Sequence, residues 1–564
     1  MNTQPSPAGQ SKSELRPRRW SRLWLVVAAL LAILFIGRAI LFEIDHQYAN
    51  MLGVACGVIA FLVGWIALWR STAIPKALRL FAGVVPIIAI LIAPWVVEFE
   101  GFTGEVLPKF RLKGPLRSAR IVRPQRPDAE SVSSVDAKSI PTEIRGYQFT
   151  QYLGDKRDGH VLEPRFSMAW DKSLPKEIWR RPIGQGWSGF AVAQGIAVTM
   201  EQIEREEAIT AIALHSGENL WQIRRQGRHE HPMGGVGPRA TPTLVELDGR
   251  WVAITVTATG HLLCIELGNG NILWEHQLLT LSGLNQASFE KGVNWGRSGS
   301  PLVHKGIVYV PLGGANAIGD SVNRERRSGS LLACSLTDGS ILWTAGKAEI
   351  AYASPALLTL DGEEQLVLVN EGSVTGHALV DGATLWETAW PSKSSGDACA
   401  SQPVQVDEHR ILIGKGYAQG SKLFEVHKLA NNEWEAKDVW NNIKVLKTKF
   451  TTSVFEDGKL IALSDGVLEC VNAKDGSRVW RGKRYGQGQL LLVNDGILVC
   501  SEDGRVVSVD KTNGNPIGEQ QVLEGITWNT FAVAGPYLLV RNGSEAVCLA
   551  SDSEDSGSRN FVTE

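Results

Sequence analysis

The sequence predicts an all-β protein, an eight-bladed β-propeller with four-stranded blades, preceded by three transmembrane α-helices. Three observations lead to this prediction. Apolar segments at 23–42, 52–69 and 78–97 each approach the ~20 residues that cross a bilayer. Further along, a short phrase containing Gly and Trp recurs at intervals of about 40 to 70 residues, which suits a propeller blade with insertions. The composition agrees, because 58 Gly and 19 Trp suit many tight turns and a recurring aromatic packing position.

The charges around the apolar segments predict the orientation in the membrane. Five basic residues precede the first segment, whereas the loop Glu43–Met51 after it has no Lys or Arg. The second loop carries Arg70, Lys76 and Arg79, and the third segment runs into acidic residues. Because basic loops stay in the cytoplasm, we expect the N-terminus inside, the helices in the cytoplasmic (inner) membrane, and everything after Val97 in the periplasm or extracytoplasmic space. A cleavable signal peptide is disfavoured, since two more apolar segments follow the first.

The repeated phrase indicates a hairpin turn followed by the last strand of a four-stranded unit. In five copies Gly stands four residues before Trp, at 216–221, 269–274, 338–343, 381–386 and 475–480. Asp-Gly and Asn-Gly supply the positive φ angles of tight hairpins. Weaker copies end at Trp179 and Trp440, and a degenerate copy at Asn513–Ile517 brings the total to eight.

The first copy lacks three preceding strands, and the chain ends with strand-like segments that lack a final Trp strand. We therefore expect the strand Glu177–Ile183 to complete the last blade, which closes the ring and removes two sheet edges. The predicted organisation is a cytoplasmic basic tail at 1–22, a three-helix transmembrane anchor at 23–97, an extracytoplasmic linker at 98–145, the propeller at 146–550 and a polar C-terminal tail at 551–564.

The phrase is similar to the signature A-x-D-x-x-x-G-x-x-x-W of the PQQ-like repeat. The resemblance covers residues Tyr147 to Ala550, including the opening phrase Phe149–Gly159. The chain resembles a membrane-anchored bacterial member of this quinoprotein alcohol dehydrogenase-like family, which includes quinone-dependent dehydrogenases and non-catalytic scaffolds. The family fold is an eight-bladed propeller in which each Trp docks against a neighbouring blade. The resemblance therefore assigns blade docking to Trp179, Trp221, Trp274, Trp343, Trp386, Trp440 and Trp480.

The resemblance does not by itself bring the quinone cofactor to this chain. The family's dehydrogenases share adjacent cysteines that form a disulfide over the cofactor, and a calcium site of Glu, Asn and Asp. None of the seven cysteines here is adjacent to another, and no recognisable set of calcium ligands is present in the sequence. We therefore expect no cofactor, no metal and no catalytic residue. PQQ with calcium belongs only to the alternative function, a PQQ-dependent quinoprotein dehydrogenase.

Two other motif matches weaken in context. Gly184–Gly189 fits G-x-G-x-x-G but leads into a strand, whereas a dinucleotide site needs a helix N-terminus there. His229-Glu230-His231 offers two metal ligands without an evident third. A formal net charge of −2 gives no basic field for nucleic acid.

The connectors between blades converge on one face of a propeller, and here they are rich in cationic and aromatic residues. Such residues bind anionic or planar ligands or anchor protein partners, although plain packing around the channel is the competing interpretation. We expect Arg239 and Arg297 to meet at one axial opening, because they occupy comparable connectors. The candidate binding residues are Arg239, Arg297, Trp295, His231, Asn294, Trp187 and Lys449.

These features predict a membrane-tethered extracytoplasmic scaffold for binding or assembly rather than an enzyme. In domain type it is similar to the propeller lipoprotein of outer-membrane protein assembly. Its expected partners are the membrane, crossed three times, and a protein or a small anionic ligand, but not nucleic acid. The alternative is an oxidoreductase of the quinoprotein type.

Overall fold

The computed structural model describes residues 20–70, 75–113, 140–163, 165–313, 329–392 and 396–551. The chain divides into two compact units: one holds the chain up to Glu98 together with Phe110–Gly114, and the other holds Phe99–Lys109 and the chain from Pro115 onward. Most of the predicted cytoplasmic tail, residues 114–139 of the predicted linker and nearly all of the predicted C-terminal tail lie outside the described residues.

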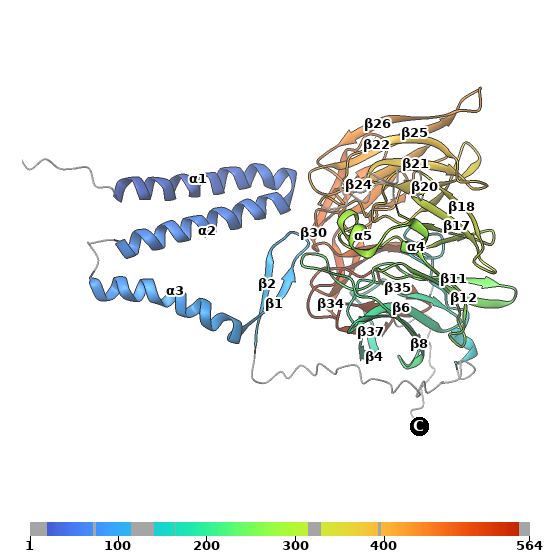
Figure 1. Ribbon diagram of the computed structural model, residues 1–564, viewed down its shortest axis with the longest axis horizontal. Helices are drawn as coiled ribbons and strands as arrows, with labels where there is room; N and C mark the ends of the chain where they lie inside the picture. Colours follow the sequence, from blue (N-terminus) through green and yellow to red (C-terminus); the bar gives the residue numbers. More distant parts are fainter. Residues whose placement is uncertain are drawn as a thin grey trace, which may run out of the picture. The chain divides into compact units, whose positions relative to one another are not determined.

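The first unit contains three helices (Figure 1), α1 (Trp20–Ile44), α2 (His46–Arg70) and α3 (Lys76–Val96), and α2 packs against both others. By length and composition alone, α2 and α3 are apolar enough to cross a membrane. The apolar stretch described in α1, Val27–Phe42, is shorter. Two of the three predicted spans therefore coincide with helices that are long and apolar enough to cross a membrane, whereas the first predicted span lies in α1, whose described apolar stretch is shorter.

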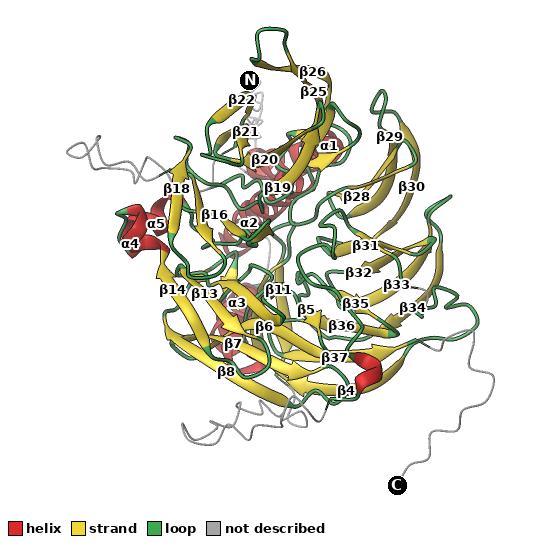
Figure 2. Ribbon diagram, turned by 90° about the vertical axis from the view of Figure 1, so that its right-hand side faces the viewer, coloured by secondary structure: helices red, strands yellow, loops and turns green. Residues whose placement is uncertain are grey.

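The second unit is built from antiparallel sheets arranged around a common centre, which is the arrangement of a β-propeller (Figure 2). Among the described residues of the chain, seven sheets have four strands and one has five. Several inner strands are buried along their whole length, as in β31 (Gln489–Val493), because sheets cover both of their faces. The outermost strands are more exposed, and in β34 (Pro516–Gln521) half-buried and exposed residues alternate.

The first four sheets along the chain contain β5 (Ala191–Ala193), β6 (Ile196–Ile203), β7 (Glu206–Ala213) and β8 (Asn219–Gln226); β11 (Thr243–Leu247), β12 (Arg250–Val256), β13 (His261–Glu266) and β14 (Ile272–Gln277); β15 (Leu302–His304), β16 (Ile307–Pro311), β17 (Leu331–Ser335) and β18 (Ile341–Ala345); and β19 (Ala356–Leu360), β20 (Glu363–Val369), β21 (Gly372–Ala378) and β22 (Thr384–Trp390).

The other four contain β23 (Val404–Gln405), β24 (Arg410–Lys415), β25 (Gly420–Lys428) and β26 (Trp434–Asn442); β27 (Val454–Glu456), β28 (Lys459–Ser464), β29 (Val467–Asn472) and β30 (Arg478–Arg484); β31, β32 (Gly496–Cys500), β33 (Arg505–Asp510) and β34 with β3 (His160–Val161); and β35 (Ala532–Ala534), β36 (Tyr537–Arg541) and β37 (Glu545–Ala550) with β4 (Lys176–Pro182). Smaller elements are the ribbons β1 (Val97–Phe102) with β2 (Pro108–Leu112) and β9 (Glu230–His231) with β10 (Gly235–Val236), and the helices η2 (Thr142–Ile144), α4 (Leu278–Ser282) and α5 (Gln286–Gly292).

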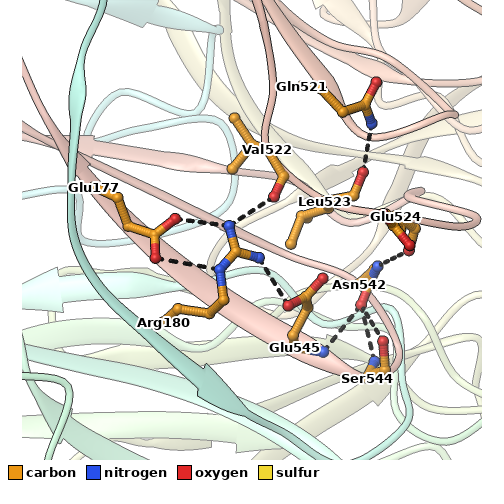
Figure 3. A network of polar contacts seen from close by, with 9 residues as sticks. All are labelled: Glu177, Arg180, Gln521, Val522, Leu523, Glu524, Asn542, Ser544 and Glu545. Atoms are coloured by element: carbon orange, nitrogen blue, oxygen red, sulfur yellow. Dashed lines mark hydrogen bonds and ion pairs between the residues drawn. The ribbon is translucent and has the colours of Figure 1, made fainter. Parts of the chain in front are cut away.

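The last sheet takes its fourth strand from the N-terminal side, as the sequence predicts. β4 pairs antiparallel with β37, so that Trp179 lies opposite Cys548. Arg180 in β4 pairs with Glu177 and Glu545 at 2.7 Å each and donates to the carbonyl of Val522 at 3.0 Å (Figure 3). The strand that closes this sheet is thus also tied to the preceding sheet, because Val522 directly follows β34.

The repeated Trp lies against the turn glycine of the next sheet. A Cβ on Gly339 would lie 2.8 Å from Trp274 Cδ2, and the Trp274 indole donates to the carbonyl of Leu336 at 2.8 Å. The same close approach joins the pairs Trp179–Gly217, Trp221–Gly270, Trp343–Gly382, Trp440–Gly476 and Trp480–Gly514. Trp386 differs, since it lies against Gly376 of its own sheet and donates to Gln365 at 2.7 Å.

Residues 149–160, which precede the first complete sheet and which we call the central segment, contact the inner strands of several sheets in turn. Phe149 bridges to Val192 in β5, and the carbonyl of Thr150 accepts from Leu244 N in β11 at 2.7 Å. His160 pairs with Leu492 in β31. The segment therefore runs along the centre around which the sheets are arranged.

Arg157 is the most connected residue of this segment. Its guanidinium is buried and donates to the carbonyls of Pro301 at 2.9 Å, Ser300 at 3.3 Å and Pro355 at 3.2 Å. Its own carbonyl accepts from Gln402 Nε2 at 2.9 Å. One arginine thus joins the starts of three consecutive sheets, and burial lowers its pKa to about 10.

Candidate binding site on the connector face

Four antiparallel strands return the chain to the side from which it entered a sheet, so all connectors between sheets lie on one side. We call this side the connector face and the opposite side the turn face. The predicted binding residues all lie in connectors: Trp187 between β4 and β5, His231 in β9, Arg239 after β10, Asn294, Trp295 and Arg297 between α5 and β15, and Lys449 between β26 and β27.

Four of these residues meet at the β9–β10 turn. Trp187 Nε1 and Arg239 Nη2 both donate to the carbonyl of Gly234, at 2.7 and 2.6 Å. Trp295 Nε1 donates to His231 Nδ1 at 3.0 Å. A Cβ on Gly234 would lie 2.7 Å from Trp295 Cδ1, so a larger residue would push this group apart. The structure therefore brings together Trp187, His231, Arg239 and Trp295 as a cluster.

Aromatic side chains continue from this cluster in both directions. Trp187 lies with its ring centroid 4.8 Å from that of Trp528, which in turn is 5.0 Å from Phe450. On the other side Trp295 is 5.3 Å from Tyr352. These separations are typical of favourable aromatic pairs. We call the five residues Phe450, Trp528, Trp187, Trp295 and Tyr352 the aromatic row.

Arg239 is the cation of the cluster. It donates to the carbonyls of Gly237 and Gly234, each at 2.6 Å. Burial lowers its pKa to about 10, against the opposing influence of Tyr352 and Glu207. The Glu207 carboxylate is committed elsewhere, because it accepts the backbone N–H groups of Ala258 at 2.9 Å and Thr259 at 3.2 Å. Arg239 thus keeps its charge at neutral pH while it holds its own loop together.

Two histidines beside Arg239 are held neutral. Burial lowers the pKa of His229 to about 3, and the nearby charge of Arg239 adds to the effect. Burial and Arg239 likewise lower the pKa of His231. The backbone of Asn294 lies beside His229, which is how Asn294 contributes to this region. The positive charge of the cluster at neutral pH therefore comes from Arg239.

Arg297 lies apart from the Gly234 cluster. It is buried, donates from Nη1 to the carbonyl of Pro311 at 3.0 Å, and lies over the ring of Phe289 at 4.5 Å. Within the described part of the chain, its Nε and Nη2 have no hydrogen-bond partner. Burial lowers its pKa to about 9. The sequence predicts that Arg239 and Arg297 meet at one axial opening, but no contact joins them among the described residues. Instead, His229 lies beside Arg239 and packs against Gly296, the neighbour of Arg297.

Lys449 belongs to a different group. It is buried, pairs with Asp465 at 3.3 Å, and donates to the carbonyl of Gly104 at 3.3 Å. Gly104 and Glu105 form the tip of the β1–β2 ribbon. The Gly104 N–H donates to Glu502 at 2.5 Å, and Glu105 pairs with Arg484. Part of the stretch predicted as a linker therefore contacts the connector face.

Two further carboxyl groups near the aromatic row carry no signal in the sequence. Glu349 and Glu371 come together because Ile350 bridges to Asn370. Burial and the neighbouring Glu371 raise the pKa of Glu349 to about 7. Both carboxyl groups act on Tyr352, whose pKa burial raises strongly. Pattern reasoning misses them because they meet only across this bridge.

The cysteines of this chain form no disulfide with one another. All seven cysteines are free and buried, and they lie in α2 and in separate strands or connectors of the propeller. Burial raises the pKa of the thiols of Cys264, Cys334 and Cys500 to about 12, so these three thiols stay protonated at neutral pH.

Repeated four-stranded sheets with a Trp against each following turn define the molecule as a β-propeller of the PQQ-like type. A family model described as outer membrane protein assembly factor BamB matches residues 166–311 and, in an overlapping match, 205–482. The chain belongs to this PQQ-like β-propeller family.

Solved structures that are similar to this chain include the following three. BamB from Moraxella catarrhalis is 15% identical, with a TM-score of 0.46 over 67% of this chain and 100% of that one. A europium-containing methanol dehydrogenase is 12% identical, with a TM-score of 0.40 over 72% and 91%. The quinohemoprotein alcohol dehydrogenase from Comamonas testosteroni is 11% identical, with a TM-score of 0.39 over 76% and 85%. Among curated proteins, no sequence matches the chain.

Proposed function

We propose that this protein is a membrane-tethered, extracytoplasmic scaffold that binds a protein partner through its connector face. The observation that carries the proposal is the aromatic row with the charged Arg239 beside it. Large rings with few rotatable bonds and an arginine are the residue types that dominate protein interfaces. A partner segment with an acidic side chain next to an apolar one fits this chemistry.

The architecture behind this proposal is a closed ring of eight blades. Its support is the contact between the inner strands β5 and β35, which belong to the first and last sheets, and the shared strand pairing of β4 with β37. We further propose a three-span anchor with the N-terminus in the cytoplasm. The alternating charges of the loops support it, and the helix α1 supplies the third segment.

Crosslinking in living cells tests the binding site. Met233 lies in the β9–β10 turn beside Gly234 and has a relative exposure of 40%. A photoreactive amino acid at this position should give one discrete protein adduct. Val380, exposed to 83% in the turn between β21 and β22, lies on the turn face and serves as the matched control.

The adduct should disappear when Trp295→Ala or Arg239→Gln is added. Gln is chosen because Arg239 holds two loop carbonyls, so removal of the whole side chain would also loosen the loop. An adduct of equal strength at Met233 and Val380, or none at Met233, would show that the connector face is not the protein-binding surface.

The quinoprotein alternative has its own test. Purified chain mixed with PQQ and calcium should show only the absorbance of free cofactor. A shifted cofactor spectrum with one equivalent bound would favour the oxidoreductase.

A further inference from the structure

A group of two histidines and one aspartate lies on the turn face, on the opposite side of the sheets from the connector residues already described. Asp361 lies in the turn between β19 and β20, His409 directly before β24, and His427 in β25. One potential ligand atom from each residue can be chosen so that all three lie within 4.8 Å of one another. The group spans two neighbouring sheets, since Asp361 belongs to one and both histidines to the next.

The imidazoles direct the same nitrogen toward the aspartate. His409 Nδ1 lies 2.9 Å from Asp361 Oδ1, and His427 Nδ1 lies 4.0 Å from Asp361 Oδ2. The two rings are 4.6 Å apart and inclined by 38°. The short His409–Asp361 contact does not have the geometry of a hydrogen bond, and within the described part of the chain His409 Nδ1 has no hydrogen-bond partner. Two imidazole nitrogens and one carboxylate are thus brought together at one place.

The opposite nitrogen of each imidazole faces a glutamate. His409 Nε2 lies 3.4 Å from Glu408 Oε1, and His427 Nε2 lies 3.6 Å from Glu425 Oε2. A carboxylate that accepts a hydrogen bond from one ring nitrogen leaves the other nitrogen free to coordinate, which is the usual environment of a metal-binding histidine. At 3.4 and 3.6 Å, Glu408 and Glu425 lie close enough to take this role after a small side-chain rotation. The same two glutamates make the surroundings anionic, which favours a cation.

The backbone holds the three ligands in place. Asp361 N donates to the carbonyl of Glu408 at 3.0 Å, and Lys428 N donates to Asp361 Oδ2 at 2.6 Å. His409 N is fixed by Asp407 at 3.0 Å. The ligand atoms of a tetrahedral zinc ion are about 3.3 Å apart, given metal–ligand distances near 2.0–2.2 Å. The separations of 2.9 and 4.0 Å involve different oxygens of Asp361, and one ligand atom from each residue can be chosen so that all three lie within 4.8 Å of one another. Side-chain rotations therefore have to draw the three atoms closer around an ion.

We propose that Asp361, His409 and His427 form a zinc site that links two neighbouring sheets. Two imidazole nitrogens and one carboxylate oxygen suit Zn²⁺ better than Mg²⁺ or Ca²⁺, which prefer oxygen ligands. The fourth position is available to water or to a nearby carboxylate. Bound zinc stabilises the contact between the sheets, because the ion binds the folded chain and not the separated ligands.

Calorimetric titration of full-length protein tests the site. The protein is purified in detergent without a polyhistidine tag and treated with a chelator. Wild type should bind one more equivalent of Zn²⁺ than His409→Gln or His427→Gln. Glu425→Gln, which changes only the group that faces His427 Nε2, should still bind this equivalent of zinc but with an affinity about 10-fold lower. Co²⁺ in place of Zn²⁺ should give wild type the visible absorption of a four-coordinate ion.

His304→Gln is the matched control. His304 Nε2 also meets a carboxylate of the next sheet, Glu364, at 3.2 Å, but without a second imidazole. This variant should bind zinc as wild type does. Asp361→Asn provides a second test should a histidine variant fold poorly, since Asn tolerates the positive φ of 46° at this position. Equal zinc stoichiometry in all proteins, or a wild type that binds neither Zn²⁺ nor Co²⁺ at micromolar concentration, would make the group an ordinary ion pair and overturn the proposal.

Discussion

The indole of Trp274 packs on Gly339, the turn glycine of the following sheet. A Cβ on Gly339 would lie 2.8 Å from Trp274 Cδ2. Gly339 has a φ of +73°, a conformation that side chains also disfavour. The repeated Gly and the repeated Trp therefore form one contact between neighbouring sheets. The spacing of four residues within each copy reflects the turn and strand of one sheet, whereas the contact joins the Trp of one copy to the Gly of the next.

The first prediction concerns this glycine. Gly339→Ala should lower the free energy of unfolding by about 2–4 kcal/mol, the sum of left-handed strain and overpacking. Gly306→Ala is the control: its φ is +76°, but nothing lies within 4 Å of its Cβ position. It should cost only the strain, about 1–2 kcal/mol. If both variants lose the same free energy of unfolding in denaturant, the close approach of Trp274 to Gly339 adds nothing to the cost of the substitution.

The second prediction separates the ring of the repeated Trp from its hydrogen bond. Trp274 donates to Leu336, whereas Trp343 Nε1 has no hydrogen-bond partner among the described residues. Trp274→Phe should therefore destabilise more than Trp343→Phe, by about 1 kcal/mol. Trp343→Ala should still cost about 3 kcal/mol through lost packing on Gly382. A melting temperature for Trp343→Ala within a degree of wild type would contradict the docking role.

The third prediction concerns the buried Arg157. Arg157→Leu removes the donor for three carbonyls in consecutive sheets and should cost about 2–5 kcal/mol. Its neighbour Lys156 is exposed, and Lys156→Ala should stay within about 0.5 kcal/mol of wild type. Chemical denaturation of both variants measures the difference. If the two variants have similar free energies of unfolding, the contacts of Arg157 in the central segment do not stabilise the packing of the sheets.

The fourth prediction concerns membrane topology. Reporter fusions that end at Glu100 should give high alkaline phosphatase activity and low cytoplasmic fluorescence, because three crossings from an inside N-terminus lead outside. If only α2 and α3 cross, an inside N-terminus leaves the fusion point inside, and the two signals are reversed. For an N-terminus in the cytoplasm, the assay thus distinguishes two crossings from three.

The fifth prediction concerns pH. The pKa of Glu349 rises from 4.5 to about 7 in the folded chain, because of burial and its neighbour Glu371. A carboxyl group with a raised pKa stabilises the fold below its unfolded pKa, and this contribution is lost as the pH rises to about 7. The melting temperature of wild type should therefore fall between pH 5 and 8 relative to that of Glu349→Gln. If the melting temperatures of wild type and Glu349→Gln change in parallel with pH, the Glu349–Glu371 pair does not make the stability depend on pH.

The local sequence pattern was sufficient to predict the repeated four-stranded sheets. The Asp-Gly turns, the strands around them and the completion of the last sheet by β4 follow from residues near each other in the chain and from the need to pair sheet edges. The separate group around Lys449 was not predictable in this way. Lys449 lies with Asp465 and with the tip of the β1–β2 ribbon, and the contact with Gly104 in this ribbon joins residues that are 345 positions apart in the sequence.

The sequence by itself determined the propeller repeat, the role of Gly in each turn and the presence of apolar helices ahead of it, because each depends on local composition and period. Only the tertiary structure decided which connector residues meet. It placed Trp187, His231, Arg239 and Trp295 around one turn and left Arg297 and Lys449 apart from them. It also brought Asp361 to His409 and His427, since contacts between neighbouring sheets depend on how the sheets pack and not on any pattern within one of them.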